Sequence, residues 1–227
     1  MKRIPCIFLA LVLILFLLSA CAVSEPDGND GPQQIQAERA DGEAQKILIA
    51  YFSWAENAVQ DDIDAMTSAS VKTPGNVAQL ASWIAEETGG DLFSVQVADR
   101  YPADWDSCLA RANEEKANDI HPALVQTLDH VEDYDTVFLG YPNWWYSCPM
   151  AIHSFLDTHD LSGKQVYLFC SHGTGGLANS VNDIAADIPG AILSENVFHV
   201  YEEDVASAES DLVTWLEELE KEQEGAV

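Results

Sequence analysis

Three short apolar runs, far apart in the chain, each lead into residues that are suited to holding a ligand. The first covers residues 46–53 and ends in a serine, and the second, at 134–140, leads into an aromatic sequence at 141–146. The third, at 165–170, leads into the sequence Ser-His-Gly-Thr-Gly-Gly at 171–176. Such runs predict buried strands, and ligands bind at the carboxyl ends of strands in an open parallel sheet. Glycine lets the backbone approach an anion and aromatic faces stack on flat rings, so these loops predict a cofactor with a phosphate and a ring.

The segments between these runs alternate between helix and strand patterns. Residues 74–76 open a helix, because proline is favoured in a first turn and apolar residues then recur at helical spacing up to Thr88, before Gly89 and Gly90. Further strands are predicted at 92–97 and 192–200, and further helices at 104–118, 149–158, 177–187 and 211–222. This alternation predicts an α/β fold, a doubly wound five-stranded parallel sheet of order 2-1-3-4-5 in a three-layer sandwich.

The first 21 residues have the features of a targeting segment. Lys2 and Arg3 precede an unbroken apolar run of 12 residues at 7–18, which is the length of a signal-peptide core and short for a membrane span. Residues 18–21, Leu-Ser-Ala-Cys, resemble the processing site of bacterial lipoproteins, in which the cysteine is lipidated. We therefore expect residues 1–21 to be a lipoprotein signal peptide and Cys21 to carry a stable lipid anchor. An ordinary secretory signal that leaves Cys21 as a spare thiol is the alternative.

The composition of the remaining chain separates a tether from a domain and limits the partners. Residues 22–45 are rich in Gly, Pro, Gln, Asp, Glu and Ala, which predicts a disordered acidic tether, and residues 46–227 have the length of one domain. The net charge of −28 argues against nucleic-acid binding, which requires a basic face. It also argues against adhesion to an anionic membrane by charge. An acidic surface suits a partner protein with a basic docking face, although solubility alone explains the charge equally well.

Several common active-site patterns are absent from the sequence. There is no Gly-x-Ser-x-Gly elbow and no P-loop, which argues against an α/β-hydrolase and against ATP or GTP binding. Cys108, Cys148 and Cys170 form no C-x-x-C motif, so neither a thioredoxin-type site nor a zinc knuckle is predicted. His172 has no ligating residue at suitable spacing. We accordingly predict no metal site and no catalytic acid, base or nucleophile.

Two motifs together carry a family resemblance. Tyr-Pro-Asn-Trp-Trp at 141–145 follows the third strand, and the glycine-rich loop 171–176 follows the fourth. Tyr101-Pro102 after the second strand and Leu-Ser-Gly-Lys at 161–164 before the fourth complete the pattern. From about residue 46 to about residue 220 the chain resembles the flavodoxins, in the subgroup that has an aromatic Tyr-Pro-x-Trp-Trp sequence. The resemblance implies the cofactor FMN.

In flavodoxins the FMN phosphate sits in the first loop, usually Ser-x-Thr-Gly-Asn-Thr, at the start of a helix. A helix N-terminus suits a phosphate because it offers free N–H groups and a positive dipole end. Here the motif is split by an insertion at 55–73, with Ser53 before it and residues 74–77 after it. Pro74 and Val77 replace the usual threonines, and Thr73 could restore one of them. A plain Pro-Gly helix start that binds no ligand is the alternative.

The resemblance assigns the isoalloxazine ring to the third-strand loop, where three consecutive aromatic residues can stack on it, and places His172 near the ring's edge. The predicted cofactor contacts are Ser53, Trp54, Thr73, Pro74, Gly75, Asn76, Val77, Pro142, Asn143, Trp144, Trp145, Tyr146, Ser171, His172, Gly173, Gly175 and Gly176.

The resulting hypothesis is an FMN-binding electron carrier that is lipid-anchored in the bacterial cell envelope, outside the cytoplasm, and serves a redox partner protein. Two alternatives stay open. One is an FMN-dependent enzyme that reduces quinones or nitro compounds with NAD(P)H, and the other is a flavodoxin-fold binding module that has lost FMN.

Overall fold

The computed structural model describes residues 45–59 and 68–225. These residues belong to one compact unit that extends from residue 43 to residue 227. The predicted signal peptide 1–21, the lipidation site Cys21 and all of the tether 22–45 except its last residue lie outside the described residues.

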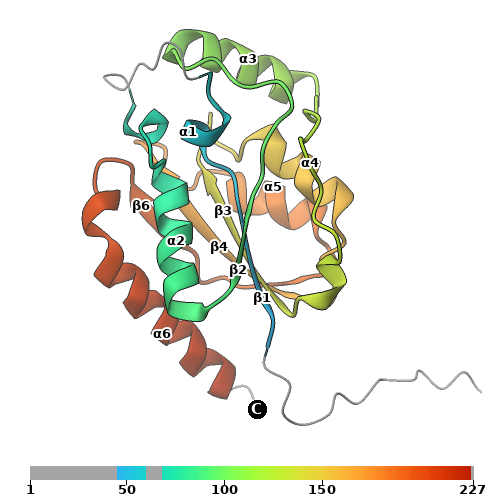
Figure 1. Cartoon of the computed structure of the whole chain (residues 1–227), viewed down its shortest axis with the longest axis vertical. Coiled ribbons are helices and arrows are strands. Elements are labelled where there is room, and N and C mark those ends of the chain that lie inside the picture. The colour runs from blue at the N-terminus through green and yellow to red at the C-terminus, as the bar shows by residue number, and fades with distance from the viewer. Residues whose placement is uncertain (1–44, 60–67, 226–227) are drawn as a thin grey trace, which may run out of the picture. The chain divides into compact units, whose positions relative to one another are not determined.

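A parallel sheet forms the centre of the described chain (Figure 1). Its strands are β1 (Ile47–Tyr51), β2 (Asp91–Ser94), β3 (Thr136–Pro142), β4 (Gln165–His172), β5 (Ile192–Leu193) and β6 (Phe198–Tyr201). The order is β2-β1-β3-β4-β5, with β6 also paired to β4, and every pairing is parallel. The predicted order 2-1-3-4-5 is confirmed.

The last predicted strand, 192–200, is wrong in one respect, because it is two strands. Strand β5 pairs with the beginning of β4, and β6 pairs with its end. Between them the polar sequence Ser194-Glu195-Asn196 leaves the sheet, and the Ser194 hydroxyl accepts a hydrogen bond from the Asn196 backbone N–H at 3.1 Å. This local bond competes with strand pairing, and β6 then re-enters the sheet where β4 leads to the glycine-rich loop.

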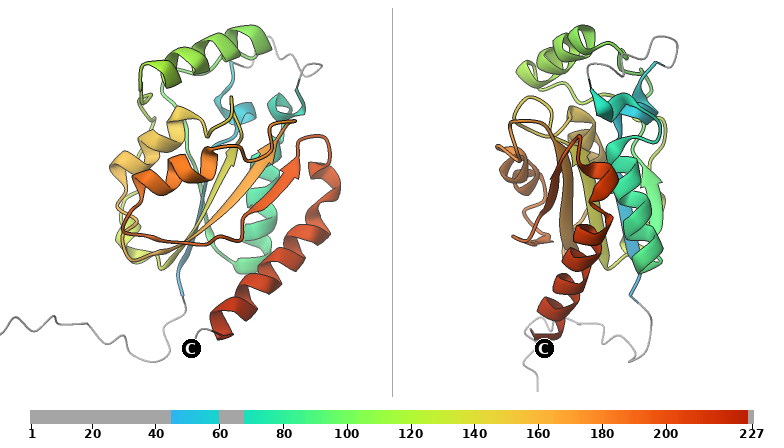
Figure 2. Two further views of the ribbon diagram at one scale, coloured as in Figure 1. Left: turned by 180° about the vertical axis from the view of Figure 1, so that it is seen from behind. Right: turned by 90° about the vertical axis from the view of Figure 1, so that its left-hand side faces the viewer.

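Helices cover both faces of the sheet. The α-helices are α1 (Trp54–Asn57), α2 (Asn76–Thr88), α3 (Trp105–Ala117), α4 (Met150–Thr158), α5 (Ser180–Asp187) and α6 (Glu209–Gly225). Three 3₁₀ turns are also present among the described residues: η1 (Ala69–Val71), η2 (Val131–Asp133) and η3 (Val205–Ser207). Figure 2 shows α2 and α6 on one face of the sheet and α4 and α5 on the other. The predicted three-layer arrangement is therefore confirmed.

The pattern of the sequence explains these layers. Alternate residues of β1 enter different cores: Leu48 and Ala50 pack in the core that contains α4, and Ile49 in the core with α2 and α6. Burial on both faces is why β1, β3 and β4 are continuous apolar runs. None of the described helices is long and apolar enough to cross a membrane.

Two predicted boundaries need correction. Strand β2 begins at Asp91 and ends at Ser94, which makes it shorter than the predicted 92–97. The segment 54–73, which includes the insertion into the phosphate motif and has no predicted helix, contains α1 and η1. Helix α1 forms here because Asn57 anchors it: its side chain donates to the carbonyls of Ser53 and Val95 at 2.9 and 3.0 Å. A buried amide that bonds the segments just after β1 and β2 at once fixes this turn, and no local sequence pattern predicts it.

Candidate functional site

A pocket lies at the carboxyl ends of β3 and β4, next to the chain that leaves β1. It is lined by Trp54, Ser68, Ser70, Trp105, Pro142, Asn143, Trp144, Trp145, Tyr146, Ser171, His172, Gly173, Thr174, Gly175 and Glu202. The three loops that the sequence singled out therefore meet in one pocket. Five lining residues were not among the predicted contacts: Ser68, Ser70, Trp105, Thr174 and Glu202.

One part of the lining, which we call the aromatic wall, consists of Trp54, Trp105, Trp144, Trp145 and Tyr146. The Trp144 ring is buried and stands edge-on to Trp54 at 5.8 Å between centroids. The rings of Trp105 and Trp145 are 6.1 Å apart. Tyr146, by contrast, is 70% exposed. The three consecutive aromatics thus divide between the core and the open surface of the pocket.

A tight turn produces this division. The backbones of Trp144 and Ser147 exchange two hydrogen bonds, of 2.8 and 3.0 Å, across Trp145 and Tyr146. Both central residues have positive φ, 48° and 67°, as in a type I′ turn. Bulky residues rarely adopt this conformation, which costs on the order of 1–3 kcal/mol for each residue. Strain of this kind is concentrated at functional sites, and here it directs aromatic side chains toward the pocket.

The second part of the lining, which we call the polar wall, consists of Ser68, Ser70, Ser171, His172 and Glu202. Two hydroxyls of the inserted segment, from Ser68 and Ser70, donate to the Glu202 carboxylate at 2.8 and 2.9 Å. The Glu202 backbone N–H donates to the carbonyl of His172 at 2.8 Å, which continues the pairing of β6 with β4. The wall therefore joins an insertion, the end of β4 and the residue after β6.

His172 has a neighbour that its sequence surroundings do not suggest. Its Nε2 lies 3.0 Å from Nδ1 of His199 on β6. Partial burial lowers the pKa of His199, and the nearby His172 lowers it further. The pair therefore favours the uncharged form of His199 beside the pocket. The signal that could have indicated it is that His172 and His199 lie near the ends of the predicted strands 165–170 and 192–200, which are consecutive in the chain.

The start of α2 lies behind the polar wall. The Asn76 side chain donates to the Glu202 carbonyl at 2.8 Å and to the Ser171 hydroxyl at 3.3 Å. The buried Ser53 hydroxyl has no hydrogen-bond partner among the described residues. A Cβ atom on Gly75 would lie 2.0 Å from that hydroxyl oxygen. The two halves of the split phosphate motif are thus in contact, as a ligand spanning them would require.

The remaining predicted contacts lie outside the pocket lining. Thr73 and Pro74 are exposed, and Val77 is buried in the core between α2 and the sheet. Gly176 has a positive φ of 59°, and its carbonyl accepts a hydrogen bond from the Asn143 side chain at 2.5 Å. Asn143 also donates its backbone N–H to Ser171 at 2.9 Å. These bonds fix the third-strand and fourth-strand loops relative to each other.

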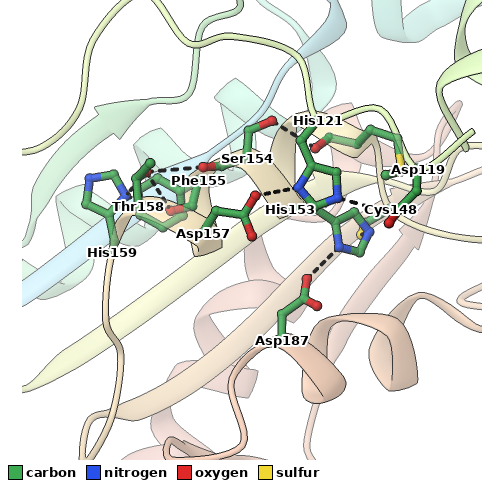
Figure 3. Close-up of polar contacts among 11 residues, drawn as sticks. Asp119, His121, Cys148, His153, Ser154, Phe155, Asp157, Thr158, His159 and Asp187 are labelled. Carbon is green, nitrogen blue, oxygen red and sulfur yellow. Dashed lines mark hydrogen bonds and ion pairs between the residues drawn. The ribbon is translucent and has the colours of Figure 1, made fainter.

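A separate polar cluster lies at α4 (Figure 3). His121 contacts Asp157 and Asp119, and His153 bonds Asp187 through one ring nitrogen. The other ring nitrogen of His153 lies 3.4 Å from the sulfur of Cys148. Burial, with a further contribution from nearby aspartates, raises the pKa of the Cys148 thiol to about 12, which favours its protonated form. No group of three or more His, Cys, Asp or Glu side chains in the described part of the chain is placed to hold a metal ion.

The family model named Flavodoxin matches residues 46–219. The chain belongs to the flavodoxin family. The predicted fold and family are therefore confirmed, and FMN is the cofactor of this family. No curated protein matches the chain.

Solved structures share the fold. A protein of Bacteroides eggerthii, described as a flavoprotein, is 26% identical, with a TM-score of 0.59 over 77% of this chain and 97% of that one. A similar protein of Bacteroides uniformis is 25% identical, with a TM-score of 0.55 over 72% and 96%. A flavoprotein of Lactobacillus acidophilus in complex with FMN is 20% identical, with a TM-score of 0.52 over 74% and 99%.

Proposed function

We propose that this flavodoxin is an FMN-binding electron carrier that is held at the bacterial membrane, outside the cytoplasm, by a lipid on Cys21. The observation that carries the proposal is the pocket in which an aromatic wall and a hydroxyl-rich polar wall meet at the carboxyl edge of the sheet. A flat ring and a phosphate are the two groups that such walls accommodate.

The residues present fit FMN. The aromatic wall offers faces and edges for the isoalloxazine ring, with Tyr146 as its most exposed member. For the phosphate, the chain offers the unpartnered hydroxyl of Ser53 beside the start of α2 and the hydroxyls of the polar wall. When bound, FMN supplies the redox chemistry, and the protein binds the cofactor, orients it and sets its electrostatic surroundings.

A carrier is favoured over an enzyme because the lining contains few groups that could move a proton. Among the lining residues that the structure describes, only His172, Glu202 and Tyr146 are titratable. His172 is engaged with His199, and Glu202 accepts two serine hydroxyls. The exposed Tyr146 lies where a partner protein could approach the ring, and the net charge of −28 suits a basic docking face on that partner.

The test of the cofactor is reconstitution of the purified protein with FMN, followed by gel filtration and an absorbance spectrum. We expect about one FMN to be retained for each chain, with tighter binding of FMN than of riboflavin. A colourless product would refute the proposal in favour of a module that has lost FMN. Steady turnover of a quinone or nitro compound with NAD(P)H alone would instead favour the reductase.

The test of location uses Cys21→Ala in the full-length chain expressed in a bacterial host. We expect this variant to lose both the lipid label and its retention in the membrane fraction, because Cys21 is the proposed attachment point. Cys6→Ala, within the same signal segment, is the matched control and should remain membrane-bound. Membrane retention of a labelled Cys21→Ala protein would contradict the anchor.

A further inference from the structure

We propose that Glu202 determines how strongly the pocket distinguishes phosphorylated from unphosphorylated flavins. Its carboxylate holds hydroxyl donors that a flavin phosphate would otherwise use, and it adds a negative charge at the same place. Glu202 thereby weakens the binding of FMN relative to riboflavin. This inference rests on the proposed function, and it names the residue that limits selectivity in that site.

Both hydroxyl contacts converge on one atom. Ser68 and Ser70 each donate to the Oε2 oxygen of Glu202, at 2.8 and 2.9 Å. A serine hydroxyl has a single hydrogen to donate. While the two serines bond Glu202, neither can donate to a phosphate, so a phosphate in the polar wall must displace the carboxylate from them.

The sheet fixes the position from which this side chain enters the wall. The Glu202 N–H donates to the carbonyl of His172, and its own carbonyl accepts from the Asn76 side chain, both at 2.8 Å. Asn76 is the first residue of α2, and it also bonds Ser171 in the pocket lining. The backbone of Glu202 is therefore held between the end of β4 and the start of α2, the helix start that is proposed to receive the phosphate.

The charge of Glu202 is not balanced locally. Within residues 45–59 and 68–225, no Lys or Arg lines the pocket and no ion pair to Glu202 is formed. A carboxylate and a phosphate dianion that share one site repel each other, and the repulsion grows as water is excluded. Riboflavin carries the same ring without the phosphate, so this repulsion does not act on it.

The experiment compares the dissociation constants of FMN and riboflavin, from quenching of flavin fluorescence, in the full-length protein and two variants. Glu202→Gln removes the charge and keeps an oxygen that accepts from both serines. We expect it to strengthen FMN binding at least about tenfold while riboflavin binding changes less than about twofold. Glu203→Gln is the matched control, because Glu203 is exposed and does not line the pocket. It should leave the ratio of the two constants unchanged.

A second substitution tests the hydroxyl donors. Ser70→Ala, made in the Glu202→Gln background, should reverse part of the gain for FMN without affecting riboflavin, because it removes a hydroxyl donor that a phosphate can take over more easily from a neutral amide than from a carboxylate. Thermal unfolding followed by circular dichroism checks that each variant is folded.

Two results would overturn the inference. One is an equal change in the affinity for both flavins in Glu202→Gln, and the other is an equal effect of Glu203→Gln, which would assign the change to overall charge. In both cases flavin binding itself, and with it the proposed function, would stand. If no variant and no wild-type protein bound either flavin, the proposed function would fail together with this inference.

Discussion

The two walls of the pocket are assembled in opposite ways. Most of the aromatic wall comes from one turn, in which Trp144, Trp145 and Tyr146 are consecutive and the turn itself divides them between core and pocket. The polar wall brings together η1, the end of β4 and the residue that follows β6. The aromatic wall is therefore a local motif on a strand end, whereas the polar wall exists only once the sheet has formed. Substitutions in the two walls should therefore differ in how much they affect the stability of the fold and how much they affect FMN binding.

The largest effect is expected in the aromatic wall. Trp144→Ala removes a buried ring that stands edge-on to Phe52 and Tyr101 at 5.3 and 5.1 Å. We expect the free energy of unfolding to fall by about 3–5 kcal/mol, as is usual for a large aromatic core residue. Urea unfolding of the apoprotein measures this. Tyr146→Ala is the matched control and should change stability by less than about 0.5 kcal/mol because its side chain is exposed. Equal losses would mean that the aromatic wall is not divided between core and surface.

A smaller effect is expected behind the polar wall. In Gly75→Ala the new methyl group would meet Ser53 Oγ at 2.0 Å and Ala55 Cβ at 2.9 Å. Because Gly75 has an ordinary φ of −68°, the cost is steric. We expect a loss of about 1–3 kcal/mol in the same unfolding measurement, accompanied by weaker FMN binding. Gly173→Ala is the control, since its nearest contact would be Glu202 Oε1 at 3.8 Å. Normal FMN binding by Gly75→Ala would show that the start of α2 does not contribute to the phosphate site.

The smallest effects concern pH, and they separate the polar wall from the cluster at α4. His199 has a lowered pKa, so the stability linked to it is present above its unfolded pKa of about 6.5 and is lost as pH falls through the folded value. Partial burial lowers the pKa of His121, but Asp157 and Asp119 outweigh this and raise it above 6.5. The stability linked to His121 is therefore present below about pH 6.5 and is lost as pH rises through the folded value.

Urea midpoints from about pH 5 to about pH 8 measure these two contributions. His199→Gln should lessen the loss of stability toward acid, and His121→Gln should lessen the loss toward alkali. Each change should be below about 1 kcal/mol, the usual range for exposed charged contacts. Changes of the same sign in both variants would contradict the opposite directions of the pKa shifts of His199 and His121.

The sequence predicted the aromatic wall better than the polar wall for a physical reason. Consecutive aromatics at the end of an apolar run are rare on a solvated surface, so Trp144 to Tyr146 stood out. Ser68, Ser70 and Glu202 are residue types found on any surface, and nothing in their spacing relates them. Their relationship depends on the pairing of β6 with β4, which brings Glu202 beside Ser171 and the start of α2. The predicted final strand concealed this, because it ran through residues 194–197 without a break.

What the sequence determined by itself was the alternation of strands and helices, the sheet order and the loops that meet at the carboxyl edge. The alternation follows from apolar periodicity and from short-range helix and turn signals, which act within a few residues. The order is the common one for five parallel strands that alternate with helices, and it places the loops at one edge. Only the tertiary structure decided which hydroxyls face which carboxylate, which histidines are paired and which aromatic ring is buried. Those features depend on contacts between residues far apart in the chain, such as Ser68 with Glu202 and His172 with His199. Only folding brings these residues together, and it thereby places the Glu202 carboxylate in the pocket, where we propose that it limits selectivity between FMN and riboflavin.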